Sequence, residues 1–193
     1  MKRIFLTIAF FAAAILGVFA NEITPSFAAP VSDKSFAINL SAFKSDEVEV
    51  SIVDQFGVVV ISETVATQSN KARVYNMKHM EDGNYTVVLQ DITKTSKQEV
   101  ILNDGEIVVG EQSNTVYKPR FNTSGDVVKI NYLALGKDVT VRLTDADGNV
   151  LYTEDINNLA VVSKALNVAA LDRGFYYASV VTPEATYTYD VIK

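Results

Sequence analysis

The chain has 193 residues, no cysteine, and 23 acidic against 17 basic residues, for a net charge of −6. This negative charge argues against nucleic acid as a partner, because phosphate backbones repel acidic surfaces. The lack of cysteine excludes disulfide bonds and the lipid attachment typical of bacterial lipoproteins, so each domain must hold together by packing.

The first 20 residues have the pattern of a secretory signal peptide. Lys2 and Arg3 give a positive start, residues 4–19 form an apolar run without a charge, and Val18 and Ala20 are small residues suited to cleavage after Ala20. An uncleaved membrane anchor is the alternative, but the run is slightly shorter than the about 20 residues that a span requires. We therefore expect export, and no stable membrane span after cleavage.

A second possible cleavage site follows Ala28 or Ala29. Loss of the signal peptide with its two basic residues leaves 15 basic and 23 acidic residues, a net charge of −8. Residues 21–30 then read as a linker. The remainder is long enough for one large domain or two small ones.

The rest of the chain repeats itself at an offset of 91 residues. The segment VEVSIVDQFGVVVISET at 48–64 aligns with VTVRLTDADGNVLYTED at 139–155, and the alignment continues without a gap to the C-terminal end. Identical pairs include Asp54 and Asp145, Gly57 and Gly148, Glu63 and Glu154, Gly83 and Gly174, and Tyr85 and Tyr176. The repeat predicts two modules, 31–110 and 115–193, with a boundary near residues 110–114.

Each copy alternates apolar and polar residues with a period of two, which is typical of half-buried strands. The segments VEVSIV and VTVRLT show this pattern, and GNYTVVLQ at 83–90 and GFYYASVV at 174–181 repeat it. Six or seven short strands per copy predict an all-β fold of two tandem antiparallel immunoglobulin-like sandwiches. A barrel is the alternative.

These segments resemble a known family, the C-terminal β-sandwich sorting domains of proteins exported by the type IX secretion system of Bacteroidota. The resemblance rests on a D-x-x-G turn at Asp145 and Gly148, an L-x-x-G-x-Y segment ending at Tyr176, and Val191 and Ile192 in the last strand. The first copy has the corresponding residues Asp54, Gly57, Met80, Gly83 and Tyr85. The resemblance implies the fold and an exported location.

Two departures from the family bear on a sorting role. The family usually opens with a proline-asparagine-proline segment, whereas VYKPRF at 116–121 has one proline. Family members also normally follow a large cargo domain, and here only two such modules are present. A sorting role is therefore an alternative prediction, in which deletion of the last strand would leave the protein in the periplasm.

The segment LTDADGNVLYTE at 143–154 raises the question of a calcium site. Asp145, Asp147 and Asn149 carry oxygen ligands around Gly148, and Glu154 falls at the twelfth position of an EF-hand spacing. The alternative is a tight hairpin turn, in which Asp and Asn bond to the backbone and Gly supplies a positive φ.

The repeat favours the turn. Phe56 and Val58 of the first copy replace Asp147 and Asn149, while the Asp and Gly of the turn persist. A strand would also carry Glu154 away from the loop. We therefore expect no cofactor, with Ca²⁺ at Asp145, Asp147 and Asn149 as the minor alternative.

No catalytic motif stands out in the sequence. His79 is the only histidine, no G-x-S-x-G or phosphate-binding glycine loop is present, and zinc would lack its usual ligands. A pair among the many carboxylates could serve glycoside hydrolysis, but no pair is distinguished. We predict a protein that is not an enzyme, with a carbohydrate-active hydrolase as an alternative.

Tyrosines of the second copy are the candidate ligand-binding residues. Tyr187 and Tyr189 lie two apart and share one face of a strand, and Tyr177 lies on a neighbouring strand. Ser96 and Gln98 hold the places of the first two in copy one, which predicts a position outside the deep core. Exposed tyrosines could stack on a glycan or dock a protein, whereas the alternative is that they cover a sheet face. We predict a binding, adhesion or structural role at the periplasm or cell surface.

Overall fold

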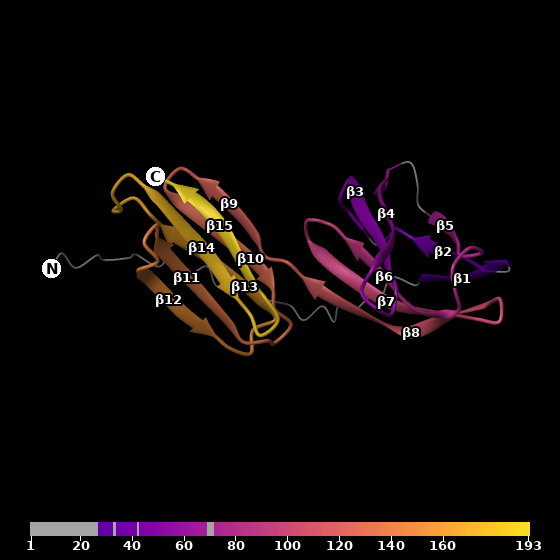
Figure 1. Cartoon of the computed structure of the whole chain (residues 1–193). Helices are drawn as coiled ribbons and strands as arrows, with labels where there is room; N and C mark the ends of the chain where they lie inside the picture. The colour runs from indigo at the N-terminus through magenta and orange to yellow at the C-terminus, as the bar shows by residue number, and fades with distance from the viewer. Residues whose placement is uncertain (1–26, 33, 42, 69–71) are drawn as a thin grey trace. The chain divides into compact units, whose positions relative to one another are not determined.

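The computed structural model describes residues 27–32, 34–41, 43–68 and 72–193 (Figure 1). The predicted signal peptide, 1–20, lies outside these residues. The described chain consists of strands and turns, and it contains no helix that could cross a membrane. The strands are β1 (Phe27–Ser32), β2 (Ser35–Asn39), β3 (Glu47–Val53), β4 (Val59–Ala66), β5 (Ala72–Asn76), β6 (Gly83–Gln90), β7 (Lys94–Asn103), β8 (Glu106–Tyr117), β9 (Arg120–Ser124), β10 (Val127–Leu133), β11 (Val139–Asp145), β12 (Val150–Ile156), β13 (Val161–Asn167), β14 (Phe175–Val181) and β15 (Thr186–Ile192).

The described chain divides into two compact units between Val116 and Tyr117, here called module 1 and module 2. Module 1 contains a three-stranded sheet, β1-β2-β5, and a five-stranded sheet, β4-β3-β6-β7-β8. Module 2 contains the sheets β13-β10-β9 and β12-β11-β14-β15. In each module the two sheets contribute side chains to one core, so the predicted tandem β-sandwiches are confirmed and the barrel alternative is wrong.

The period-two pattern explains the core. Val48, Val50 and Ile52 of β3 are completely buried, and β11 buries Val139, Val141 and Leu143 in the same way. Burial of each such side chain stabilises the fold by roughly 1.5–3 kcal/mol. The intervening residues of β3, from Glu47 to Val53, are exposed or half-buried, which fixes the register of the strand.

Seven strands of module 1, β1 to β7, correspond in order and pairing to the seven strands β9 to β15 of module 2. The strand β8 is additional, and it pairs with β7. It contains the predicted module boundary, residues 110–114, and β1 contains residues 27–30, which the sequence assigned to a linker.

A two-residue turn returns the chain from β7 into β8. Asp104 has φ +48° and Gly105 has φ +85°, the left-handed conformations of a type I′ hairpin turn. This turn matches the twist of the flanking strands, so β8 continues the sheet beyond β7.

Candidate functional site

The proposed calcium residues of module 2 form a closed hairpin turn. Asp145 Oδ1 accepts hydrogen bonds from the backbone N–H groups of Asp147 and Asn149 at 3.0 and 2.9 Å, and Oδ2 accepts one from Asn149 Nδ2 at 2.9 Å. The side-chain bond from Asn149, together with these backbone bonds, lowers the pKa of Asp145. Gly148 has φ +83°, which the turn requires. Both oxygens of this carboxylate therefore serve the turn.

The same turn occurs in module 1 without the additional oxygen ligands. Asp54 Oδ1 accepts hydrogen bonds from the N–H groups of Phe56 and Val58 at 2.9 and 2.8 Å, and Gly57 has φ +84°. The turn therefore needs only its Asp and its Gly. Within the described ranges, no three His, Cys, Asp or Glu side chains are grouped as a metal site would require.

Glu154, the twelfth residue of the EF-hand spacing, lies in an ion pair away from the turn. Its carboxylate accepts hydrogen bonds from Lys164 Nζ at 2.6 Å and from the Tyr152 hydroxyl. In module 1, Glu63 accepts two bonds from Arg73, at 3.0 and 2.8 Å. Each pair joins the two sheets at one edge of its sandwich, β12 to β13 and β4 to β5. The identity of Glu63 and Glu154 in the repeat was the sequence signal for this pair.

The L-x-x-G-x-Y segment builds a second shared feature. The Tyr85 hydroxyl donates a hydrogen bond to the carbonyl of Glu81 at 2.6 Å, and the Tyr176 hydroxyl donates one to the carbonyl of Asp172 at 2.9 Å. This is the tyrosine corner of immunoglobulin-like sandwiches, which fixes the connection before a strand. The segment is thus explained by the fold.

The three candidate tyrosines lie on two faces of one sheet. Tyr187 and Tyr189 of β15 pair with Val180 and Ala178, which are buried, so they face the inside of the sandwich. Tyr177 precedes Ala178 on β14 and therefore faces outward. The structure brings Tyr187 and Tyr189 together and separates Tyr177 from them.

Tyr189 closes one side of module 2. Its ring stacks on Phe121 of β9, with ring centroids 5.3 Å apart and an angle of 2° between the planes. Its hydroxyl lies 3.3 Å from Thr123 Oγ1, which donates a hydrogen bond to it. The ring therefore bridges the two sheets at the β15 edge, while remaining half-buried.

The inference drawn from Ser96 and Gln98 is wrong. Ser96 is 0% exposed and Gln98 is 7% exposed, because β8 lies against β7 and covers them. The Ser96 hydroxyl bonds with that of Thr115 at 2.9 Å, and Gln98 Nε2 donates to the carbonyl of Gly110 at 2.5 Å. A polar residue in one copy of a repeat indicates an exposed position in the other copy only where both copies have the same neighbouring strands.

The outward face of β14 and β15 carries an exposed apolar patch, of which Tyr177 alone was singled out from the sequence. Phe175, Tyr177 and Ile192 are 62%, 37% and 73% exposed, and Phe175 lies directly opposite Ile192 in the strand register. We call these three residues the β14–β15 patch. In module 1 the places of the first two are held by Asn84 and Thr86. The alternation around Tyr176 could have identified Phe175 as well, because it lies on the same face of β14 as Tyr177.

A shallow hollow of about 410 Å³ lies at one end of module 2. It is lined by Asp138, Val139, Thr140, Asp155, Asn157, Val181, Thr182 and Pro183. Asp155 Oδ1 accepts a hydrogen bond from Thr140 Oγ1 at 2.6 Å. The lining contains carboxylates but no histidine, and His79 lies in the other module, exposed in the connection before β6. The contact between Thr140 and Asp155 is exposed, and the lining has no third group that orients the carboxylate as in a catalytic triad.

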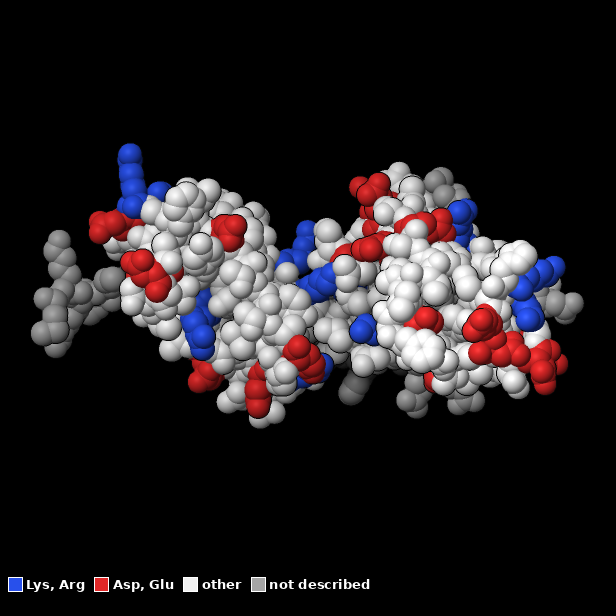
Figure 2. All heavy atoms as spheres, viewed as in Figure 1, with Lys and Arg blue, Asp and Glu red and all other residues white. Residues whose placement is uncertain are grey.

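Charged side chains are scattered over the described surface. In the view of Figure 2, Lys and Arg side chains lie among acidic ones, and on neither module do they gather into a broad basic patch.

Comparison with known proteins identifies the family. The profile of the family described as "Secretion system C-terminal sorting domain" matches residues 27–103 and 122–193, one match in each module. No curated protein sequence matches the chain.

Several solved structures are similar to this chain. The BSP domain of a biofilm associated protein has 18% identity and a TM-score of 0.28, over 86% of this chain and 28% of that one. A two-domain fibronectin type-III segment of chicken tenascin has 7% identity and a TM-score of 0.31, over 86% of this chain and 96% of that one. The β-glucuronidase of Ruminococcus gnavus has 14% identity and a TM-score of 0.27, over 77% and 30%. This chain thus spans less than a third of the first and third of these proteins.

The two profile matches cover most of both sandwiches, and they include the Asp–Gly turn and the tyrosine corner of each, together with the equivalent strands β7 and β15. The chain therefore belongs to the family of type IX secretion-system C-terminal sorting domains.

Proposed function

We propose that this chain is an exported, non-enzymatic protein that binds a partner through module 2, at the periplasm or the cell surface. The observation that carries this proposal is the β14–β15 patch. The two modules share strands, turns and tyrosine corners, yet the outward face of module 2 has Phe175 and Tyr177 where module 1 has Asn84 and Thr86.

The exposure of this patch has no role in the fold. An aromatic side chain on the solvent side of a strand gains little from folding, and module 1 folds in the same way with polar residues there. Contiguous exposed apolar residues are typical of surfaces that bind proteins or glycans. A partner covering Phe175, Tyr177 and Ile192 would remove them from water.

The test exchanges the patch residues for those of module 1. The double variant Phe175→Asn, Tyr177→Thr of the full chain should fold normally and lose binding to a glycan array or to isolated cell envelopes. Ile92→Asn is the control, because Ile92 is an exposed apolar residue of module 1. Equal binding by the double variant and the control would contradict a role for the patch.

A sorting role is the second proposal, and the family match in both modules supports it. A reporter fused to module 2 should then reach the surface of a bacterium that has a type IX system. The same reporter fused to module 1 tests whether β8, which follows β7 in that module, interferes with sorting to the surface. Retention of both fusions in the periplasm would argue against sorting and leave the binding proposal intact.

A further inference from the structure

The two modules differ most in what lies beside their equivalent strands β7 and β15. In module 1, β7 lies between β6 and β8, whereas β15 has β14 as its one strand neighbour among the described residues. We propose that β15 is a docking edge, which accepts an extended segment of a partner protein in the place that β8 takes in module 1. This inference rests on the proposed binding function and states what kind of partner is bound, namely an extended protein segment.

The backbone of β15 has a row of groups directed toward this edge. Gly174 and Lys193 exchange two hydrogen bonds, N–H to O=C, at 3.2 and 3.0 Å, so their pair is of the hydrogen-bonded type. Such pairs alternate in an antiparallel ladder. The residues of β15 whose N–H and C=O groups therefore point away from β14 are Thr186, Thr188, Asp190 and Ile192.

This edge lacks the features by which sheet edges usually avoid strand addition. β15 pairs with β14 over seven residues without a bulge, and it contains no proline and a single charge, Asp190. Bulges, prolines and lysines normally protect such edges. The other edges of module 2 differ from it: β9 has five residues, β13 has seven but carries Lys164, and the β11–β12 ladder shifts register near Leu143.

Module 1 shows which segment fits such an edge. Ile107 of β8 is buried and Val109 packs against the core, while Gly110 and Thr115 contact the side chains of β7. The strand thus has apolar residues at 107–109, followed by a glycine and polar residues at 110–115. The edges of module 1 equivalent to β9, β12 and β13 carry no added strand within the described part of the chain. Only the edge equivalent to β15 is extended.

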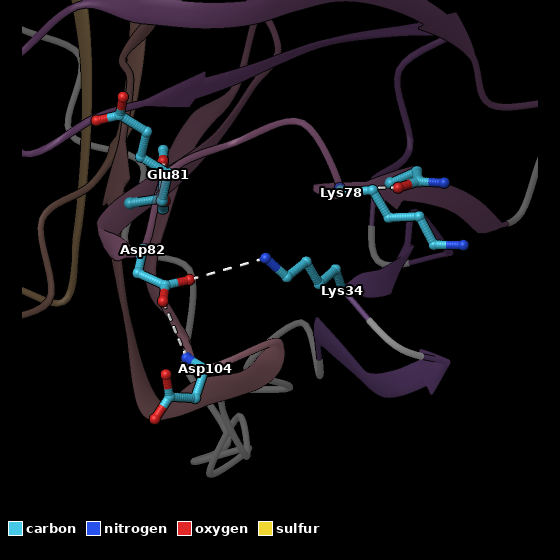
Figure 3. A network of polar contacts seen from close by, with 7 residues as sticks. Lys34, Lys78, Glu81, Asp82 and Asp104 are labelled. Atoms are coloured by element: carbon cyan, nitrogen blue, oxygen red, sulfur yellow. Dashed lines mark hydrogen bonds and ion pairs between the residues drawn. The ribbon is translucent and has the colours of Figure 1, made fainter.

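A separate strand fits module 2 better than a hairpin continuation. In module 1, Asp82 holds the β7–β8 turn: its carboxylate accepts the N–H of Asp104 at 3.1 Å and lies 3.9 Å from Lys34 Nζ (Figure 3). The repeat places Arg173 where module 1 has Asp82, and Asp126 directly precedes β10 as Lys34 directly precedes β2. Module 2 therefore lacks the anchor for a tight turn at that corner.

The tyrosines of β15 set the side-chain requirement of the partner segment. Tyr187 and Tyr189 stand where Ser96 and Gln98 contact β8, and their rings are half-buried. Because the rings already fill part of this space, the residues of the partner that face them must be small, as Thr115 beside Ser96 is. The partner is thus an extended segment with small residues facing Tyr187 and Tyr189 and apolar residues beyond them.

The probe for this edge is a labelled synthetic peptide with the sequence of β8, EIVVGEQSNTVY, added to the full chain. Fluorescence anisotropy should show binding, and hydrogen exchange should show protection at Thr186, Thr188, Asp190 and Ile192. Thr188→Pro removes one outward N–H without touching the β14 ladder, and it should weaken binding about tenfold or more. Thr188→Val keeps the N–H and should bind as the native chain does.

A second measurement leaves the protein unchanged. N-methylation of alternate peptide residues blocks one edge of the peptide, so one of the two alternating patterns should abolish binding and the other should preserve it. The proposal is overturned if millimolar peptide does not bind, if Thr188→Pro binds equally, or if both methylation patterns bind alike. Self-association of the chain that Thr188→Pro abolishes would also overturn it, because a second copy would then fill the edge.

The docking edge and the β14–β15 patch can fail separately. Phe175→Asn, Tyr177→Thr changes the outward face and leaves the edge backbone of β15 in place. Loss of envelope binding in that variant, without any peptide binding to the native chain, would retain the proposed function and reject the docking edge. Peptide binding that depends on the Thr188 N–H supports the edge whatever the patch variant does.

Discussion

At the scale of single residues, the tyrosine corners are the interactions that the two modules share most closely. The hydroxyls of Tyr85 and Tyr176 each bond to a carbonyl four residues upstream, while their rings are buried. Tyr85→Phe and Tyr176→Phe remove only the hydroxyl and keep the ring. Each substitution should lower the free energy of unfolding of its own module by about 1 kcal/mol, because one hydrogen bond is lost and its carbonyl acceptor is left unpaired.

Hydrogen exchange followed by mass spectrometry measures this effect module by module. Tyr85→Phe should speed exchange in β3 and β6 and leave β11 and β14 unchanged, and Tyr176→Phe should do the reverse. Tyr117→Phe is a control for the loss of a tyrosine hydroxyl outside either corner. Equal acceleration of both modules by one variant would contradict local anchoring.

The ion pair of Glu154 makes module 2 sensitive to acid. Burial alone would raise the pKa of Glu154, but the hydrogen bonds from Lys164 and Tyr152 outweigh it and lower the pKa below its usual value near 4.5. A carboxyl group with a lowered pKa in the folded state contributes stability above its unfolded pKa, and this contribution is lost as the pH falls through the folded value.

Denaturant unfolding between pH 7 and pH 3 therefore tests the pair. Glu154→Gln should reduce the free energy of unfolding at pH 7, and the difference from the native chain should shrink as the pH falls below about 4.5. The reason is that protonated Glu154 is uncharged, as glutamine is, so at low pH neither side chain forms the ion pair with Lys164. A difference that stays constant over this range would mean that the charge of Glu154 does not contribute.

The sequence predicted residue roles well where both modules share an interaction, and poorly where they differ. Asp54 and Asp145 could be read as turn residues because the repeat kept them and changed their neighbours. Ser96 and Gln98 could not be placed, because their burial depends on β8, which has no counterpart among the described strands of module 2. The period-two pattern shows which face of the sheet a side chain points to, but it does not show which strand lies beside it.

At the scale of elements, β8 is the strand that distinguishes module 1, and Asp82 anchors its turn (Figure 3). Asp82→Ala removes the acceptor of the Asp104 N–H and the partner of Lys34. Because the contact is exposed, the cost should be small, about 0.5–1 kcal/mol, and confined to the hairpin. We expect faster hydrogen exchange in β8 and the adjoining part of β7, with β3 and β6 unchanged.

Glu81→Ala is the matched control, since it shortens the neighbouring acidic side chain and keeps the carbonyl that Tyr85 uses. An equal effect of the two variants would show that loss of acidic charge, and not the turn contact, governs β8. The sequence alone did not reveal β8 as a strand of module 1, because the segment lies beyond the repeat and reads as the boundary between modules. Its pairing with β7 is set by the Asp104–Gly105 turn.

At the scale of the whole molecule, the gapless repeat predicted the two-module organisation, because a repeated hydrophobic pattern must bury a repeated core. The start of the mature chain was not determined in the same way, since three cleavage positions fit the small-residue rule. The extent of β1 gives a reason to favour one of them. β1 begins at Phe27, and its pairing with β2 starts with Phe27 opposite Ile38.

Cleavage after Ala28 or Ala29 would remove the start of β1, whereas cleavage after Ala20 leaves the whole strand. We therefore predict that the exported protein begins at Asn21, which intact mass measurement and N-terminal sequencing can check. A chain shortened to begin at Pro30 should lose stability in module 1, because β2 loses part of its hydrogen-bonded neighbour, while the exchange rates of module 2 should not change. Isolation of an exported protein that begins at Ala29 or Pro30, with module 1 as stable as in the longer chain, would show that β1 is dispensable.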